Sequence, residues 1–67
     1  MSKKEYRSFF ANVSNRLKMR YYLDIAGIPA TTFSRFMKSE QFDFMISVDR
    51  LNNLYDVIIS DLSEIIA

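Results

Sequence analysis

Hydroxyl and basic side chains gather in one short segment of the chain. Residues 30–38 read ATTFSRFMK, and at 100° per residue Thr31, Ser34, Arg35 and Lys38 fall on one side of a helix, with Thr32 on a flank. Arg and Lys neutralise phosphates or pair with guanine, and Ser and Thr bond to phosphates or base edges. The pattern favours contact with a nucleic acid, although each residue taken alone also suits an ordinary solvated surface.

The elements around this segment predict how it is positioned. Its other side is apolar, with Phe33, Phe36 and Met37, and would face a core. The only glycine and the only proline of the chain, Gly27 and Pro29, stand just before it. Glycine often sits just past a helix end, and proline is tolerated in the first turn of a helix. The sequence therefore predicts a helix, a tight turn and a second helix.

The run Gly27–Phe36, GIPATTFSRF, resembles the turn and recognition helix of the Cro/phage-repressor (Xre-like) helix-turn-helix proteins. Three positions depart from the usual pattern of that family. Leu23 replaces a small alanine, Met19 replaces a frequent glutamine, and Pro29 replaces a Ser or Thr cap. The resemblance implies an all-α, compact, five-helix domain of the lambda-repressor-like helix-turn-helix kind. It also implies sequence-specific binding of double-stranded DNA and transcriptional repression.

The resemblance further implies that residues 30–38, the third helix of the domain, lie in the major groove of the DNA. This placement suggests roles for individual residues. We expect base contacts from Thr31, Thr32, Ser34 and Arg35, and phosphate contacts from Lys38, Arg16, Lys18, Arg20 and Ser39. The apolar C-terminal residues Leu62, Ile65 and Ile66 either close the core of their own chain or pair two copies as a homodimer, as in several members of the family. A homodimer would bind a pseudo-palindromic site with half-sites about one helical turn apart.

Apolar periodicity predicts the remaining elements. A first helix over residues 3–18 carries the stripe Tyr6, Phe9, Phe10, Val13 and Leu17. A second, from about residue 19 to 26, would turn Met19, Tyr22, Ile25 and Ala26 inward, although one long helix through residue 26 is the competing interpretation. Residues 39–47 alternate with a period of two, which predicts an extended loop that drops Phe42, Phe44 or Ile46 into the core. Ser47 and Ser60 are N-cap candidates for a fourth helix and a short fifth helix.

Composition limits the chemistry of the chain. It has 67 residues with neither Cys nor His, which excludes disulfides, a thiol nucleophile and the common zinc sites. The serines have no evident general base and no glycine-rich loop is present, so we expect no enzyme, no cofactor and no small-molecule substrate. No apolar run approaches the ~20 residues that span a bilayer. We expect a single domain over residues 1–67, cytoplasmic and without a membrane partner.

Charge is distributed unevenly along the chain. Residues 1–38 hold eight cations and two acids, a net charge of +6, whereas residues 39–67 hold one cation and six acids, a net charge of −5. Such polarity suggests that one end faces a polyanion, unless both halves are simply solvated surface.

Two alternatives to a complete DNA-binding repressor stay open. The chain is a small helical protein-binding module, a phage-type inhibitor or antirepressor with the same fold and a basic partner, or it is the DNA-binding part of a longer regulator.

Overall fold

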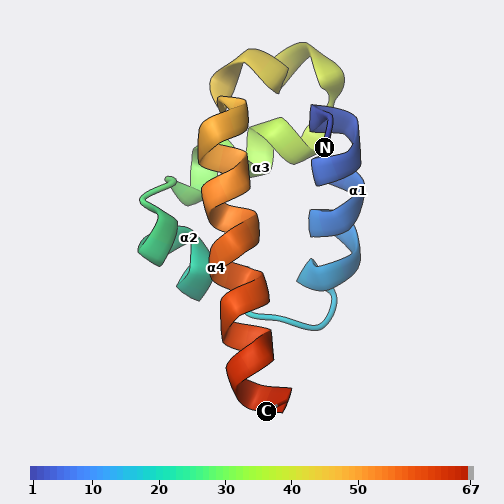
Figure 1. The fold of residues 1–67 in the computed structure, drawn as a ribbon. Helices are drawn as coiled ribbons and strands as arrows, with labels where there is room; N and C mark the ends of the chain where they lie inside the picture. Colours follow the sequence, from blue (N-terminus) through green and yellow to red (C-terminus); the bar gives the residue numbers. More distant parts are fainter. Residues whose placement is uncertain (67) are drawn as a thin grey trace.

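Every regular element is helical in the part of the chain that the computed structural model describes, which is the backbone of residues 1–66 and the side chains of residues 1–64. In chain order the elements are α1 (Lys3–Ser14), α2 (Met19–Ala26), α3 (Ala30–Lys38), the 3₁₀ helix η1 (Glu40–Met45) and α4 (Val48–Ile66). Figure 1 shows α4 along the length of the molecule, α1 and α2 on either side of it, α3 behind it and η1 across one end. The predicted all-α, compact five-helix architecture is confirmed.

The core lies where α4 packs against the other helices. Among the side chains of residues 1–64, twelve hydrophobic ones are buried, and the largest of those that are fully enclosed are Phe10, Phe36, Ile46, Leu51, Leu54 and Ile58. Two tyrosine hydroxyls at the edge of this core donate hydrogen bonds to α4. Tyr6 donates to Oδ1 of Asn52 at 2.9 Å, and Tyr22 donates to Oδ2 of Asp61 at 2.6 Å. These bonds fasten α1 and α2 to the long helix while keeping both hydroxyls paired.

The first helix is shorter than the sequence predicts. It begins with a capping box, in which Ser2 accepts a hydrogen bond from the backbone N–H of Glu5 and Glu5 bonds back to the N–H of Ser2. It ends at Ser14 rather than at residue 18, because the hydroxyl of Ser14 bonds to the carbonyl of Phe10 at 2.6 Å and a turn follows. Such bonds compete with regular helix geometry. The competing interpretation of one long helix through residue 26 is wrong.

The inward face of α2 also differs from the prediction. Met19 and Tyr22 are buried as expected, but Leu23 is buried where Ile25 was expected, and Ile25 is 54% exposed. An eight-residue helix is too short for its period alone to fix its rotation. Leu23 therefore takes the core position, and Ile25 stays on the surface beside α4.

Residues 39–47 do not form an extended loop. They contain the 3₁₀ helix η1, in which the N–H of Phe42 bonds to the carbonyl of Ser39 at 3.2 Å. Of the three candidates for the core, Ile46 is fully buried, and Phe44 is 80% exposed. Extended backbone angles are found at Ser39 and Ile46, on either side of η1, so the alternation of residue types does not predict the conformation of this connection.

The predicted fourth and fifth helices are one continuous helix. Ser47 caps α4 by accepting from the N–H of Arg50 at 3.3 Å, as predicted, but Ser60 lies inside α4 and caps nothing. Neither Gly nor Pro interrupts the sequence there, and the apolar stripe of Leu51, Leu54 and Ile58 continues in phase to Leu62. No helix among the described residues combines the length and the apolar character needed to cross a membrane.

Candidate nucleic-acid interface

The turn between α2 and α3 has the geometry that its glycine predicts. Gly27 has φ 73° and ψ 30°, the left-handed conformation that residues with a Cβ rarely adopt. Its N–H bonds to the carbonyl of Asp24, and the N–H of Ile28 bonds to the carbonyl of Leu23 at 2.9 Å, which is a Schellman motif. Ile28, the residue after this glycine, is 3% exposed and packs in the core.

An arginine from α4 also holds this turn. The Nη2 of Arg50 donates to the carbonyl oxygen of Gly27 at 2.6 Å, which satisfies a peptide group just outside the helix. The sequence prediction missed this contact. One signal was available, because Arg50 is the only cation among the acidic residues 39–67. The bond joins the turn to the first turns of the longest helix and fixes where α3 begins.

The two faces of α3 are separated as the sequence predicts. Phe36 is fully buried and Phe33 is 8% exposed, so the apolar face meets the core. The side chains of the opposite face are exposed and together line a shallow hollow of about 270 Å³: Thr31, Ser34, Arg35 and Lys38. Thr32, the fourth predicted base-contacting residue, is half-buried on the flank. The structure thus presents two hydroxyls and two cations on one exposed face of α3.

Ser39 does not fit the phosphate contact predicted for it. Its Oγ is buried and has no hydrogen-bond partner, and its residue is the extended link between α3 and η1. A hydroxyl in that position cannot meet a phosphate while the link keeps this conformation. The prediction rested only on the place of Ser39 after the third helix, which does not determine where a side chain points.

The other predicted phosphate-binding cations are available to a partner. Arg16, Lys18 and Arg20, at the connection between α1 and α2, are all exposed, as is Lys38. None of them bonds to another side chain among the described residues, where the only ion pair joins Arg7 to Asp43. Their side chains therefore face the solvent without an acidic partner among the described residues.

Two further cations of the basic half have internal roles instead. Arg7 pairs with Asp43, donates through Nε to the carbonyl of Phe36 at 3.1 Å, and lies 4.6 Å from the centre of the Phe36 ring. Lys3 donates through Nζ to the carbonyl of Asp43 at 2.7 Å. Together they bind η1 and the end of α3 to α1, so the element that carries the exposed face is held at both ends.

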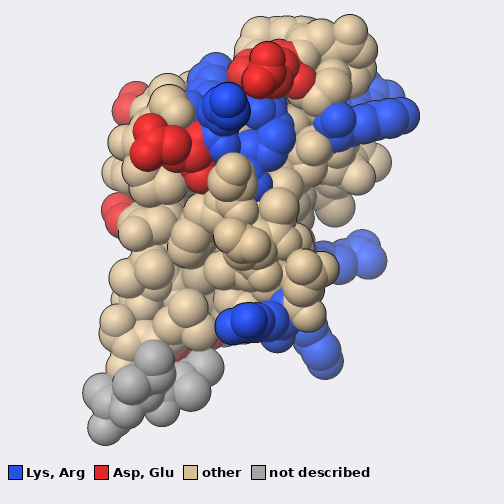
Figure 2. Space-filling view, turned by 90° about the vertical axis from the view of Figure 1, so that its right-hand side faces the viewer, with Lys and Arg blue, Asp and Glu red and all other residues tan. Residues whose placement is uncertain are grey.

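The charges are also separated in space. Figure 2 shows Lys and Arg side chains along one edge of the molecule, at its lower end and in the upper middle of the face, where they lie beside acidic side chains; other Asp and Glu side chains lie toward the opposite edge, where α4 runs. On this face, the charge contrast between the two halves of the sequence is therefore partly a contrast between two edges of the fold. Such a distribution orients a polyanion toward the basic side.

The residues predicted to pair two copies are only partly described. Leu62 is half-buried and packs against the core of its own chain, which matches the first of the two roles considered for the C-terminal residues. The side chains of Ile65 and Ile66 lie outside the described residues. Figure 1 shows that the last turns of α4 extend beyond the other helices.

Comparison of the chain with protein-family models, with curated proteins and with solved structures gave no match.

Proposed function

We propose that this chain is a sequence-specific double-stranded DNA-binding protein of the helix-turn-helix kind that regulates transcription. In this proposal α3 enters the major groove. Arg35 reads a base, most simply guanine, with Thr31 and Ser34 beside it, and Lys38 neutralises a phosphate. Thr32 contributes from the flank of the helix.

One observation carries the proposal: the exposed face of α3 holds hydroxyls and cations but no acid, and it follows a hydrogen-bonded turn. A helix about to enter a groove must have its position fixed by the rest of the fold, because base contacts depend on register. The N-terminal end of α3 is held in place by the turn at Gly27, the buried Ile28 and the hydrogen bond from Arg50. The C-terminal end of α3 is held by the hydrogen bond that Arg7 donates to the carbonyl of Phe36.

The cations between α1 and α2 extend the proposed contact to the DNA backbone. Arg16, Lys18 and Arg20 would each neutralise a phosphate beside the groove. A single small module makes few contacts, so we further propose that two copies bind together on a pseudo-palindromic site. The projecting end of α4 is the surface we assign to their pairing.

The experiment begins with selection of bound duplexes from a random pool, followed by fluorescence anisotropy at several salt concentrations. We expect one base pattern to be enriched, and the affinity to fall linearly with salt on logarithmic axes, with a slope of about −0.9 for each phosphate neutralised. The matched control for Arg35→Ala is Lys4→Ala, which removes an exposed cation of α1 to which the proposal assigns no DNA contact. No binding to any duplex at low salt would overturn the proposal and favour a protein-binding module.

A further inference from the structure

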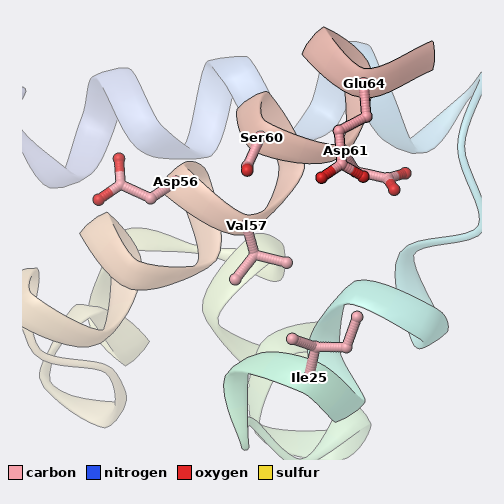
Figure 3. A pocket seen from close by; sticks show the side chains of 6 residues that line it. All are labelled: Ile25, Asp56, Val57, Ser60, Asp61 and Glu64. Carbon is pink, nitrogen blue, oxygen red and sulfur yellow. The ribbon is translucent and has the colours of Figure 1, made fainter.

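A groove between α2 and α4 lies apart from the α3 face. It encloses about 420 Å³ and is lined by Ile25, Asp56, Val57, Ser60, Asp61 and Glu64. Figure 3 shows Ile25 of α2 and Val57 of α4 pointing toward one another at its floor, with Asp61 and Glu64 together at one end and Asp56 at the other. None of the lining residues belongs to the proposed DNA-binding surface.

The floor of this groove is unusually apolar for an exposed place. Ile25 is 54% exposed although α2 has a buried face available, and Val57 opposite it on α4 is half-buried. Isolated surface hydrophobics are ordinary, but these lie beside a hollow with an acidic rim. An apolar strip with charged edges is the form taken by grooves that accept an amphipathic helix.

The acidic side chains at the rim of the groove, Asp56, Asp61 and Glu64, indicate which kind of partner fits it. The groove is lined by three acids and no cation, so nucleic acid is repelled from it. A second copy of the chain pairing through this groove about a two-fold axis would place the same acids opposite each other, which is also repulsive. A helix with an apolar stripe and with Lys or Arg on its flanks is complementary to both the apolar floor and the acidic rim.

We propose that the groove between α2 and α4 is a docking site for a basic amphipathic helix of another protein. Apolar side chains of that helix cover Ile25 and Val57, and its cations meet Asp56 and Glu64. Asp61 is assigned a smaller share, because it already accepts the hydroxyl of Tyr22 at 2.6 Å and also borders a hollow with Arg16 and Lys18. This inference does not depend on the proposed DNA binding, since the two surfaces share no residue.

The probe is a synthetic peptide of about 14 residues with Leu at positions i, i+3, i+4 and i+7 and Lys on both flanks. It is titrated into the ¹⁵N-labelled full chain, and amide shifts are followed by NMR. We expect the largest shifts at Ile25, Val57 and Ser60. Ile25→Ser should weaken binding about fivefold, whereas Ile59→Ser, an exposed isoleucine outside the groove, should leave it unchanged.

Charge is tested with two double variants that remove the same number of acids. Asp56→Asn with Glu64→Gln should weaken peptide binding about three- to tenfold, and Asp24→Asn with Asp49→Asn, which are exposed elsewhere, should have little effect. Equal losses in both, shifts centred on α3, or absence of binding would overturn the proposal. Sedimentation showing self-association that Ile25→Ser abolishes would also overturn it, in favour of a second copy.

Discussion

Basic side chains in the N-terminal half of this chain perform two different tasks. Lys3 and Arg7 bond to Asp43 and hold η1 against α1, whereas six others are exposed: Lys4, Arg16, Lys18, Arg20, Arg35 and Lys38. An internal cation acts on stability, because its bonds are lost on unfolding. An exposed cation acts on association with a polyanion and has little effect on the fold. Mutations in these two groups should therefore affect different measurements.

Two exposed cations of α3 should differ in what they contribute to DNA binding. Arg35→Ala is expected to cost about 1–3 kcal/mol on the selected duplex and to blur its base preference, because a bidentate base contact is lost. Lys38→Ala should weaken selected and random duplexes alike and reduce the salt slope by about one phosphate. Anisotropy titrations on both duplexes measure this. Equal losses on both duplexes for Arg35→Ala would contradict its role as a base-reading residue.

Tyr22 makes stability depend on pH in the alkaline range. The hydrogen bond to Asp61 raises the pKa of the Tyr22 hydroxyl above its ordinary value, and burial and the Asp61 charge raise it further. The folded chain thus holds this proton more tightly than the unfolded chain does. The contribution is complete below the unfolded pKa of about 10 and is lost as pH rises through the folded-state pKa.

Urea unfolding between about pH 8 and pH 12 should show this loss. The stability advantage of the natural chain over Tyr22→Phe is expected to shrink as pH rises. Asp61→Ala should remove the same trend without touching the ring, because the acceptor is absent. A constant difference between the natural chain and Tyr22→Phe across the range would show that the bond does not perturb the tyrosine.

At the scale of elements, the parts with strong local signals were predictable. Gly27 can adopt a positive φ that other residues avoid, and Pro29 opens the next helix, so the turn and both sides of α3 followed from the sequence. The wrongly predicted helix start at Ser60 shows what local signals cannot decide, because a serine is a good N-cap and is also tolerated inside a helix. Only the packing of α4 against the rest of the fold decides between the two. The bond from Arg50 to Gly27 could not be predicted either, because it joins residues far apart in the sequence. The burial of the Ser39 hydroxyl depends on the rotamer of one side chain, which the sequence does not determine.

The connection through η1 offers a test of which residue holds it to the core. Ile46 is fully buried and Phe44 is 80% exposed, although the sequence treats them as equals. Ile46→Ala should cost about 2–5 kcal/mol of unfolding free energy through lost burial and a cavity. Phe44→Ala should change it by less than about 0.5 kcal/mol. Urea denaturation of both variants gives the comparison, and similar losses would mean that η1 packs through its phenylalanine.

The whole molecule is elongated and carries its charges on two sides. Its extents are 38 × 22 × 21 Å, and the long dimension reflects the single helix α4 rather than a fourth and a separate fifth helix. The cations of α3 are exposed, and acidic side chains lie toward the edge of Figure 2 along which α4 runs. A domain of this form would meet DNA with one side and leave the groove between α2 and α4 uncovered. Binding of DNA and of a basic helix would then be compatible in one molecule.

Pairing of two copies on DNA would make affinity depend on the distance between half-sites. With half-sites about 10 base pairs apart, both α3 helices face the same side of the duplex, and the second copy binds without twisting the first. Inserting about five base pairs turns the second half-site to the opposite side, so the gain from pairing should disappear. Anisotropy on duplexes with one half-site, two in phase and two out of phase separates these cases. We expect the in-phase duplex to bind at least tenfold more tightly per half-site, a difference of about 1.4 kcal/mol. If all three duplexes bind equally per half-site, the copies act independently, and the end of α4 has no part in DNA binding.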